Sequence, residues 1–169
     1  MNLFTGDSAD AYFGGDVPAT VRELLHEAVT VPPRERTALL WTAQAIAPDC
    51  LAVYYTLYKH HTRQREYDLA ERAARRGLAQ AARQAGLDLR GEPLLPGTRV
   101  DFFSDGPARF WLFTLKALAF ICLRSGRPGV ARDLLTRIEQ LEPQARLGDD
   151  VIAALLRATG PGTAGERGD

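Results

Sequence analysis

Apolar residues recur every three or four positions along almost the whole chain, and no convincing stretch alternates with a period of two. Positions spaced three and four apart lie on one face of an α-helix, whereas a half-buried strand needs strict alternation. Val21, Leu24, Leu25 and Ala28 form one such helical face. The spacing therefore predicts an all-α protein.

Proline and glycine divide this pattern into about seven helices. Proline fits the first turn of a helix but disrupts its interior, so Pro32-Pro33 is expected to end one helix and begin the next. Pro48 is expected to close that second helix, and the carboxylate of Asp49 to cap the third. Gly86 is predicted to stop the fourth helix in a left-handed cap.

The chain is predicted to form one domain over residues 17–158, because 169 residues with 46% hydrophobic content can bury a single core. Residues 1–16 are expected to form a flexible arm, and residues 159–169 a disordered tail. Residues 86–106 fit neither period and are expected to be one long irregular connection. Asp105 is expected to cap the helix after it, and Asp149 the last helix.

Charge and cysteine content limit the classes of partner and compartment. The 21 basic residues equal the 21 acidic residues, so no overall field draws the chain toward nucleic acid or an anionic membrane. Cys50 and Cys122 are expected to be core residues of a reduced cytoplasmic protein. Residues 110–123 are very apolar but include Lys116 and are too short to span a membrane, which favours a buried central helix.

Two stretches of the sequence have corresponding apolar and small residues. The second copy consists of Leu115, Leu118, Ala119, Cys122, Gly126, Ala131, Leu135, Ile138 and Pro143. The first consists of Tyr54, Leu57, Tyr58, His61, Arg65, Tyr67, Ala70, Ala74 and Gly77. Over residues 33–156 this pattern resembles the tetratricopeptide repeat. The resemblance implies antiparallel helix pairs stacked as a right-handed α-solenoid, with Ala70 and Ala131 where paired helices touch.

The pattern also departs from that repeat. Tyr58 replaces the usual glycine, and the copies start at Leu51 and Leu112, 61 residues apart, where the family has 34. The surplus falls in a longer fourth helix and in the irregular connection. An unrelated helical bundle with alanines in its core is the alternative.

In that family the first helix of each pair lines a concave groove, and the resemblance places aromatic rings and cations there. The matching positions are Tyr55, Lys59, Arg63, Phe113, Lys116, Phe120 and Arg124. Rings supply apolar area, and cations bind carboxylates through charge-assisted hydrogen bonds, so the groove is expected to bind an acidic or aromatic peptide. The alternative is that the rings belong to the core and the cations are a solvated rim.

A metal site and an RNA-binding face are weaker interpretations of the sequence. A metal set of His60 and His61 with His26 and Cys50 is not expected, because adjacent helical histidines point about 100° apart. Helically spaced arginines can contact RNA, but nearby acids make an ordinary solvated face the simpler explanation. These arginines are Arg65, Arg72, Arg76 and Arg83.

A small helical enzyme would have to use the carboxylates of Asp101 and Asp105. No nucleophile, oxyanion site or phosphate-binding glycine loop lies beside them in the sequence. The sequence therefore favours a non-enzymatic binding protein without a cofactor.

The favoured interpretation is a cytoplasmic, bacterial adaptor or chaperone-like protein that holds a protein or peptide partner. A protein similar to type III secretion chaperones is the alternative of the same class. FTLKALAFICLRSG and LGDDVIAALL also resemble small accessory proteins of bacterial nitrogen-fixation regions.

Overall fold

The structure is a computed structural model, and it describes residues 15–104 and 106–141. These residues form six α-helices and no strand, which confirms the all-α prediction. The helices are α2 (Ala19–Thr30), α3 (Pro33–Ile46), α4 (Leu51–Arg63), α5 (Tyr67–Ala85), α6 (Gly106–Arg124) and α7 (Pro128–Leu141). The count in this part of the chain is thus six rather than about seven. The expected seventh helix and the Asp105 cap lie outside the described residues.

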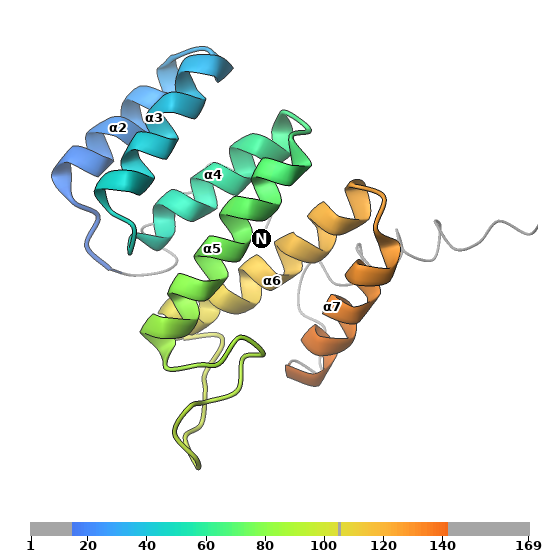
Figure 1. The fold of residues 1–169 in the computed structure, drawn as a ribbon. Helices are drawn as coiled ribbons and strands as arrows, with labels where there is room; N and C mark the ends of the chain where they lie inside the picture. Colours follow the sequence, from blue (N-terminus) through green and yellow to red (C-terminus); the bar gives the residue numbers. More distant parts are fainter. Residues whose placement is uncertain (1–14, 105, 142–169) are drawn as a thin grey trace, which may run out of the picture.

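Each helix packs against the next one in the sequence, and α4 also contacts α6. Figure 1 shows that consecutive helices run in opposite directions. The helices α4 and α6 consequently run in the same direction, and α5 packs on both of them. Corresponding faces of α4 and α6 therefore lie near one another although their sequences are far apart.

The ends of the helices lie at the predicted proline and glycine positions. Pro33 is the first residue of α3, and Gly86 ends α5 with φ 67° and ψ 38°, as predicted. Pro128 is likewise the first residue of α7. The prediction that Asp49 caps α4 is wrong. The N-cap of α4 is Cys50, without a side-chain capping bond, so Asp49 lies one residue too early. Its carbonyl accepts a 2.7 Å hydrogen bond from Gln84 Nε2 instead.

The turn between α4 and α5 is closed by two backbone hydrogen bonds. The amide of Arg65 donates to the Thr62 carbonyl at 3.1 Å, and the amide of Glu66 donates to the His61 carbonyl at 2.9 Å. Arg65 takes a φ of 59°, in the left-handed region that glycine favours. This pair of bonds around one left-handed residue is a Schellman turn.

The turn between α6 and α7 has the same two bonds 61 residues later. The amide of Gly126 donates to Leu123 at 3.2 Å, and the amide of Arg127 donates to Cys122 at 2.9 Å. Gly126 occupies the left-handed position with a φ of 80°. The two turns therefore use one geometry, with arginine in the first and glycine in the second.

The core lies where α4, α5 and α6 meet. A Cβ atom added at Gly77 would lie 2.9 Å from the Cβ of Tyr54 and 3.2 Å from the ring of Phe110, so a larger residue does not fit there. Ala70 and Ala131 are completely buried, as the sequence predicts for contact points between helices.

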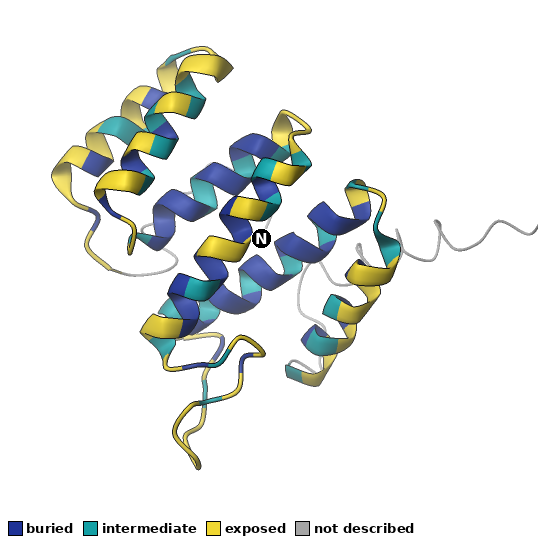
Figure 2. Ribbon diagram, viewed as in Figure 1, coloured by how far each residue is buried: buried dark blue, intermediate teal, exposed yellow. Residues whose placement is uncertain are grey.

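Helix α6 is the most buried of the described helices (Figure 2). Of the described helices, it alone is long and apolar enough to cross a membrane by length and composition, with a mean hydropathy of 1.3. About two thirds (67%) of that window is buried inside the protein, which is typical of a core helix. The prediction of a buried central helix is confirmed.

The connection after α5 is irregular, as predicted, but its first part is firmly held. Leu87 and Pro93 form an isolated bridge, and Arg137 of α7 donates to the Arg90 carbonyl at 2.6 Å and to Glu92 Oε1 at 2.7 Å. The backbone of Gly91 lies against the Trp111 ring with φ 83°, leaving no space for a Cβ. Within this connection Leu89, Leu94 and Leu95 are exposed.

Candidate functional site

The seven predicted partner-binding residues lie on α4 and α6, and we refer to them together as the α4–α6 surface. Their centre is a ring contact between the two helices. The ring centroids of Tyr55 and Phe113 are 5.9 Å apart. Lys59 Nζ lies 5.2 Å from the Tyr55 ring centroid, a cation–π distance, and 3.4 Å from its hydroxyl. The structure thus brings together two rings and a cation from distant parts of the sequence.

The other members lie closer to the carboxyl ends of the two helices. Phe120 and Lys116 are half-buried on α6, and Arg63 and Arg124 are exposed near the carboxyl ends of their helices. Arg124 Nε lies 3.5 Å from the Tyr67 hydroxyl of α5, so this side chain turns toward a neighbouring helix. Arg124 thus contacts a residue outside the seven.

The alternative that the rings belong to the core is correct in part. Tyr55, Phe113 and Phe120 are all packed against the core, and all three remain half-buried. An aromatic ring that is half-buried is held in place by its inner edge and still offers its outer edge to a ligand. The three rings therefore contribute to the core while each remains only partly buried.

The charge of the two helices has one sign, because neither α4 nor α6 contains an aspartate or a glutamate. Their basic side chains are Lys59, Arg63, Arg109, Lys116 and Arg124. Lys59, Arg63, Arg109 and Lys116 have further interactions, as do both central rings, so none of them is free. The positive charge of these helices is nevertheless not balanced from within either helix.

The phenol of Tyr58 lies beneath this surface and adds no charge. Its hydroxyl is 3.5 Å from Thr114 Oγ1, and both residues are buried. Burial raises the pKa of Tyr58 far above its ordinary value, because the phenolate would be desolvated. Tyr58 therefore links α4 to α6 as a neutral group.

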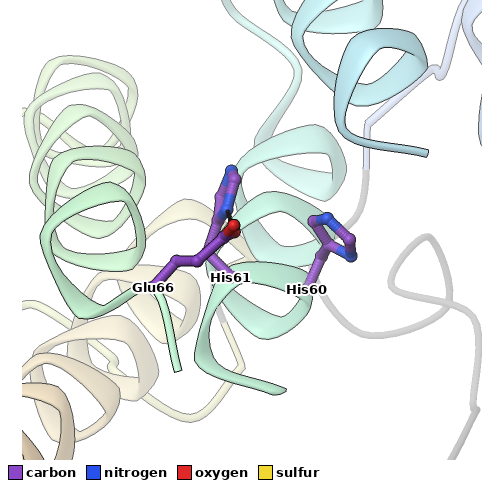
Figure 3. Close-up of side chains that lie close together, drawn as sticks. All are labelled: His60, His61 and Glu66. Carbon is purple, nitrogen blue, oxygen red and sulfur yellow. Dashed lines mark hydrogen bonds and ion pairs between the residues drawn. The ribbon is translucent and has the colours of Figure 1, made fainter. Parts of the chain in front are cut away.

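A second polar cluster holds the end of α4 (Figure 3). His61 Nδ1 lies 2.6 Å from Glu66 Oε2, and Trp41 Nε1 donates to His61 Nε2 at 3.1 Å. The indole N–H can only donate, so His61 Nε2 must accept, and the proton on Nδ1 points to the carboxylate. His61 thus fastens α4 to α3 on one side and to the following turn on the other.

His60 faces α3 and has one unused atom. Its Nε2 lies 2.8 Å from Thr37 Oγ1, whose hydroxyl donates to the Pro33 carbonyl at 3.0 Å. The proton is therefore on His60 Nε2, and Nδ1 is buried without a hydrogen-bond partner. Burial, and then the positive charges of neighbouring groups, lower the pKa of His60. A neutral His60 is the form that this site favours.

The sequence reasoning missed this arrangement. His26 is exposed on α2 and does not join the cluster, whereas His60, His61 and Glu66 place potential ligand atoms within 4.8 Å of one another. Glu66 joins because the left-handed turn at Arg65 folds the chain back toward α4. Binding a cation at His61 would break its bond to Trp41 or to Glu66, so the contacts indicate a structural role.

Two of the four arginines in the RNA interpretation, and Asp101 of the two carboxylates in the enzyme interpretation, have local partners in the described part of the chain. Arg76 stacks over Trp41 at 5.6 Å, and Arg83 donates to Gln80, while Arg65 and Arg72 are exposed. Asp101 Oδ1 accepts the amides of Phe103 and Ser104 at 2.8 and 3.1 Å. These bonds hold the pKa of Asp101 below its ordinary value, so it stays ionised and shapes a turn.

Comparison with known proteins gives one informative similarity. The chain is 28% identical over 159 residues to a protein of Azotobacter chroococcum mcd 1 named "Uncharacterized 19.8 kDa protein in nifW 5'region". The alignment covers 92% of this chain and 89% of that protein. No protein-family profile matches the chain. No solved structure is significantly similar to it.

Proposed function

We propose that the chain is a non-enzymatic adaptor or chaperone-like protein that binds an acidic or aromatic segment of a partner protein on the α4–α6 surface. The observation that carries the proposal is the contact of Tyr55 with Phe113 at 5.9 Å, with Lys59 Nζ 5.2 Å from the centre of the tyrosine ring. Both helices lack carboxylates of their own, so a partner's carboxylates would meet cations and half-buried rings.

The proposal includes a tetratricopeptide-like arrangement of the helices. It is supported by the two turns with identical hydrogen bonding 61 residues apart and by the complete burial of Ala70 and Ala131. In such an arrangement the first helices of successive pairs lie side by side and share one binding face. The contact of α4 with α6 is consistent with this geometry.

We place the protein in bacterial nitrogen fixation as an accessory protein of the cytoplasm. The support is the similarity to the protein from the 5′ region of nifW, which extends over nearly the whole of both chains. The partner is then expected among the proteins made under nitrogen-fixing conditions. Affinity purification from nitrogen-fixing and from ammonium-grown cells tests this setting, and an identical set of captured proteins would refute it.

The binding surface is tested by titrating the full chain with fluorescently labelled peptides that combine aspartate with phenylalanine or tyrosine. A micromolar complex requires about 8 kcal/mol of net binding free energy. The double variant Lys59→Glu and Lys116→Glu is expected to weaken binding at least about tenfold, since it replaces attraction by repulsion.

The matched control is Arg72→Glu with Arg132→Glu, which reverses two exposed charges on α5 and α7. This control keeps the net charge of the lysine variant and is expected to bind like the wild type. Equal weakening by both variants would show that net charge rather than this surface governs binding. Thermal melting of all three proteins identifies any loss caused by unfolding.

A further inference from the structure

We propose that residues 1–14 of the same chain bind the α4–α6 surface and compete there with the partner. This inference rests on the proposed function of that surface. It assigns the surface an occupant of known sequence, MNLFTGDSADAYFG. A partner segment would bind by displacing these residues.

The first argument is chemical complementarity. Residues 1–14 contain no lysine or arginine, and they combine Asp7 and Asp10 with Phe4, Tyr12 and Phe13. Helices α4 and α6 carry the opposite charge without any carboxylate. Aspartates would pair with these cations, while the rings would pack beside the outer edges of half-buried aromatics.

The second argument is selectivity between the two ends of the chain. Residues 142–169 contain three arginines and no phenylalanine, tyrosine or tryptophan. They supply no aromatic ring, and their arginines offset part of their negative charge. Of the two terminal segments outside the described structure, residues 1–14 alone have the composition that the surface requires.

The third argument is reach. Residues 15–18 lead into α2 with Val17 buried, and Figure 1 shows this start at the end of the molecule where α4 begins. Fourteen extended residues span up to about 46 Å, at about 3.3 Å each. Helix α4, with 13 residues, is about 20 Å long at 1.5 Å per residue. The segment can therefore pass along α4 and reach α6.

The expected strength of the competition follows from effective concentration. A segment tethered by a short flexible linker acts at a local concentration in the millimolar range. If the separate peptide binds with a Kd of about 100 µM, the tethered segment would weaken binding of a competitor by about tenfold. Its removal should restore the full affinity.

The test uses the full chain with Phe4→Ser, Asp7→Ser, Asp10→Ser and Phe13→Ser, which keeps its length. A labelled peptide of sequence MNLFTGDSADAYFG is titrated into this variant, into the wild type, and into the variant that also carries Lys59→Glu and Lys116→Glu. The peptide is expected to bind the first about tenfold more tightly than the wild type, and to lose binding to the third. A peptide with both aspartates replaced by serine is the control ligand and should bind weakly to all three proteins.

Equal affinity of the wild type and the first variant for MNLFTGDSADAYFG would overturn the proposal, as would absence of binding to that variant at 1 mM, roughly the effective concentration of the tethered segment. An unrelated aspartate–phenylalanine peptide separates this failure from failure of the proposed function. Binding of that peptide through Lys59 and Lys116, with no effect of the N-terminal substitutions, would leave the surface function intact. Light scattering shows whether residues 1–14 bind the surface of their own chain or of a second copy. A dimer that depends on residues 1–14 would overturn the proposal that the binding is intramolecular.

Discussion

The substitutions Arg65→Gly and Gly126→Ala, at the two left-handed positions, should change the free energy of unfolding in opposite directions. Arg65 and Gly126 occupy equivalent places in turns with the same hydrogen bonds, at φ 59° and 80°. A residue with a Cβ pays about 1–2 kcal/mol to adopt the left-handed conformation, and glycine does not. The substitution Arg65→Gly should therefore remove strain that Gly126→Ala would introduce.

The expected magnitude is smaller than the strain itself, because glycine also gives the unfolded chain more freedom. That freedom costs about 0.4–1 kcal/mol. Arg65→Gly should accordingly raise the free energy of unfolding by about 0.5–1 kcal/mol, and Gly126→Ala should lower it by a similar amount. For a chain of this size, 1 kcal/mol corresponds to about 2–4 °C in Tm.

The assay is urea denaturation followed by circular dichroism, with the slope of the transition used to check that the unfolded state is unchanged. Arg72→Gly is the matched control, because Arg72 is exposed within α5 and glycine in a helix interior costs about 1 kcal/mol. Destabilisation by Arg65→Gly equal to that of the control would refute the argument. A neutral Gly126→Ala would refute it for the second turn.

Three further substitutions or conditions probe the core and the polar clusters. Gly77→Ala should lower the unfolding free energy by about 1–3 kcal/mol through overpacking, whereas Gly129→Ala, which meets no atom within 4 Å, should be neutral or stabilising in the same denaturation assay. The lowered pKa of His60 means that the unfolded chain binds its proton more readily, so stability should fall as pH drops below about 6.5. The loss should be absent from a His60→Gln variant measured between pH 7.5 and 5. The hydrogen bond from Arg127 is the main cause that lowers the pKa of Glu71. Ionised Glu71 therefore stabilises the fold fully above the ordinary pKa of glutamate, and this stabilisation is lost as pH falls through the lowered pKa of the folded protein. Glu71→Gln should cost about 1.5–3 kcal/mol at neutral pH and reduce the acid dependence of Tm.

Most of the fold could be predicted because its helices are delimited by residues with a fixed local effect. Pro33, Gly86 and Pro128 act on their own backbone, and the structure places helix ends at each of them. The capping role of Asp49 failed because many polar residues precede helices and the cap position depends on a single residue of register. Arg65 is harder still, since arginine has no preference for a left-handed turn. The sequence signal for a left-handed residue at this turn is that Arg65 corresponds to Gly126 in the second copy.

The candidate site was predictable only in part because it depends on contacts between distant residues. The repeat resemblance placed Tyr55 and Phe113 on the groove-lining helices of two successive pairs, but it did not predict that their rings lie 5.9 Å apart. The degree of burial of these rings does not follow from helical spacing. The histidine cluster was missed since Trp41 and Thr37 come from α3, and Glu66 reaches His61 only through the turn. Sequence spacing within α4 contains none of these partners.

Helices α4 and α6 are in contact across a long stretch of sequence for a geometric reason. The residues between them form α5, which has 19 residues, and the connection that precedes α6. Figure 1 shows this connection extending from the end of the helices rather than passing between α4 and α6. Tyr55 can therefore still meet Phe113, and Tyr58 can still meet Thr114. The α4–α6 surface therefore depends on the direction and packing of its two helices.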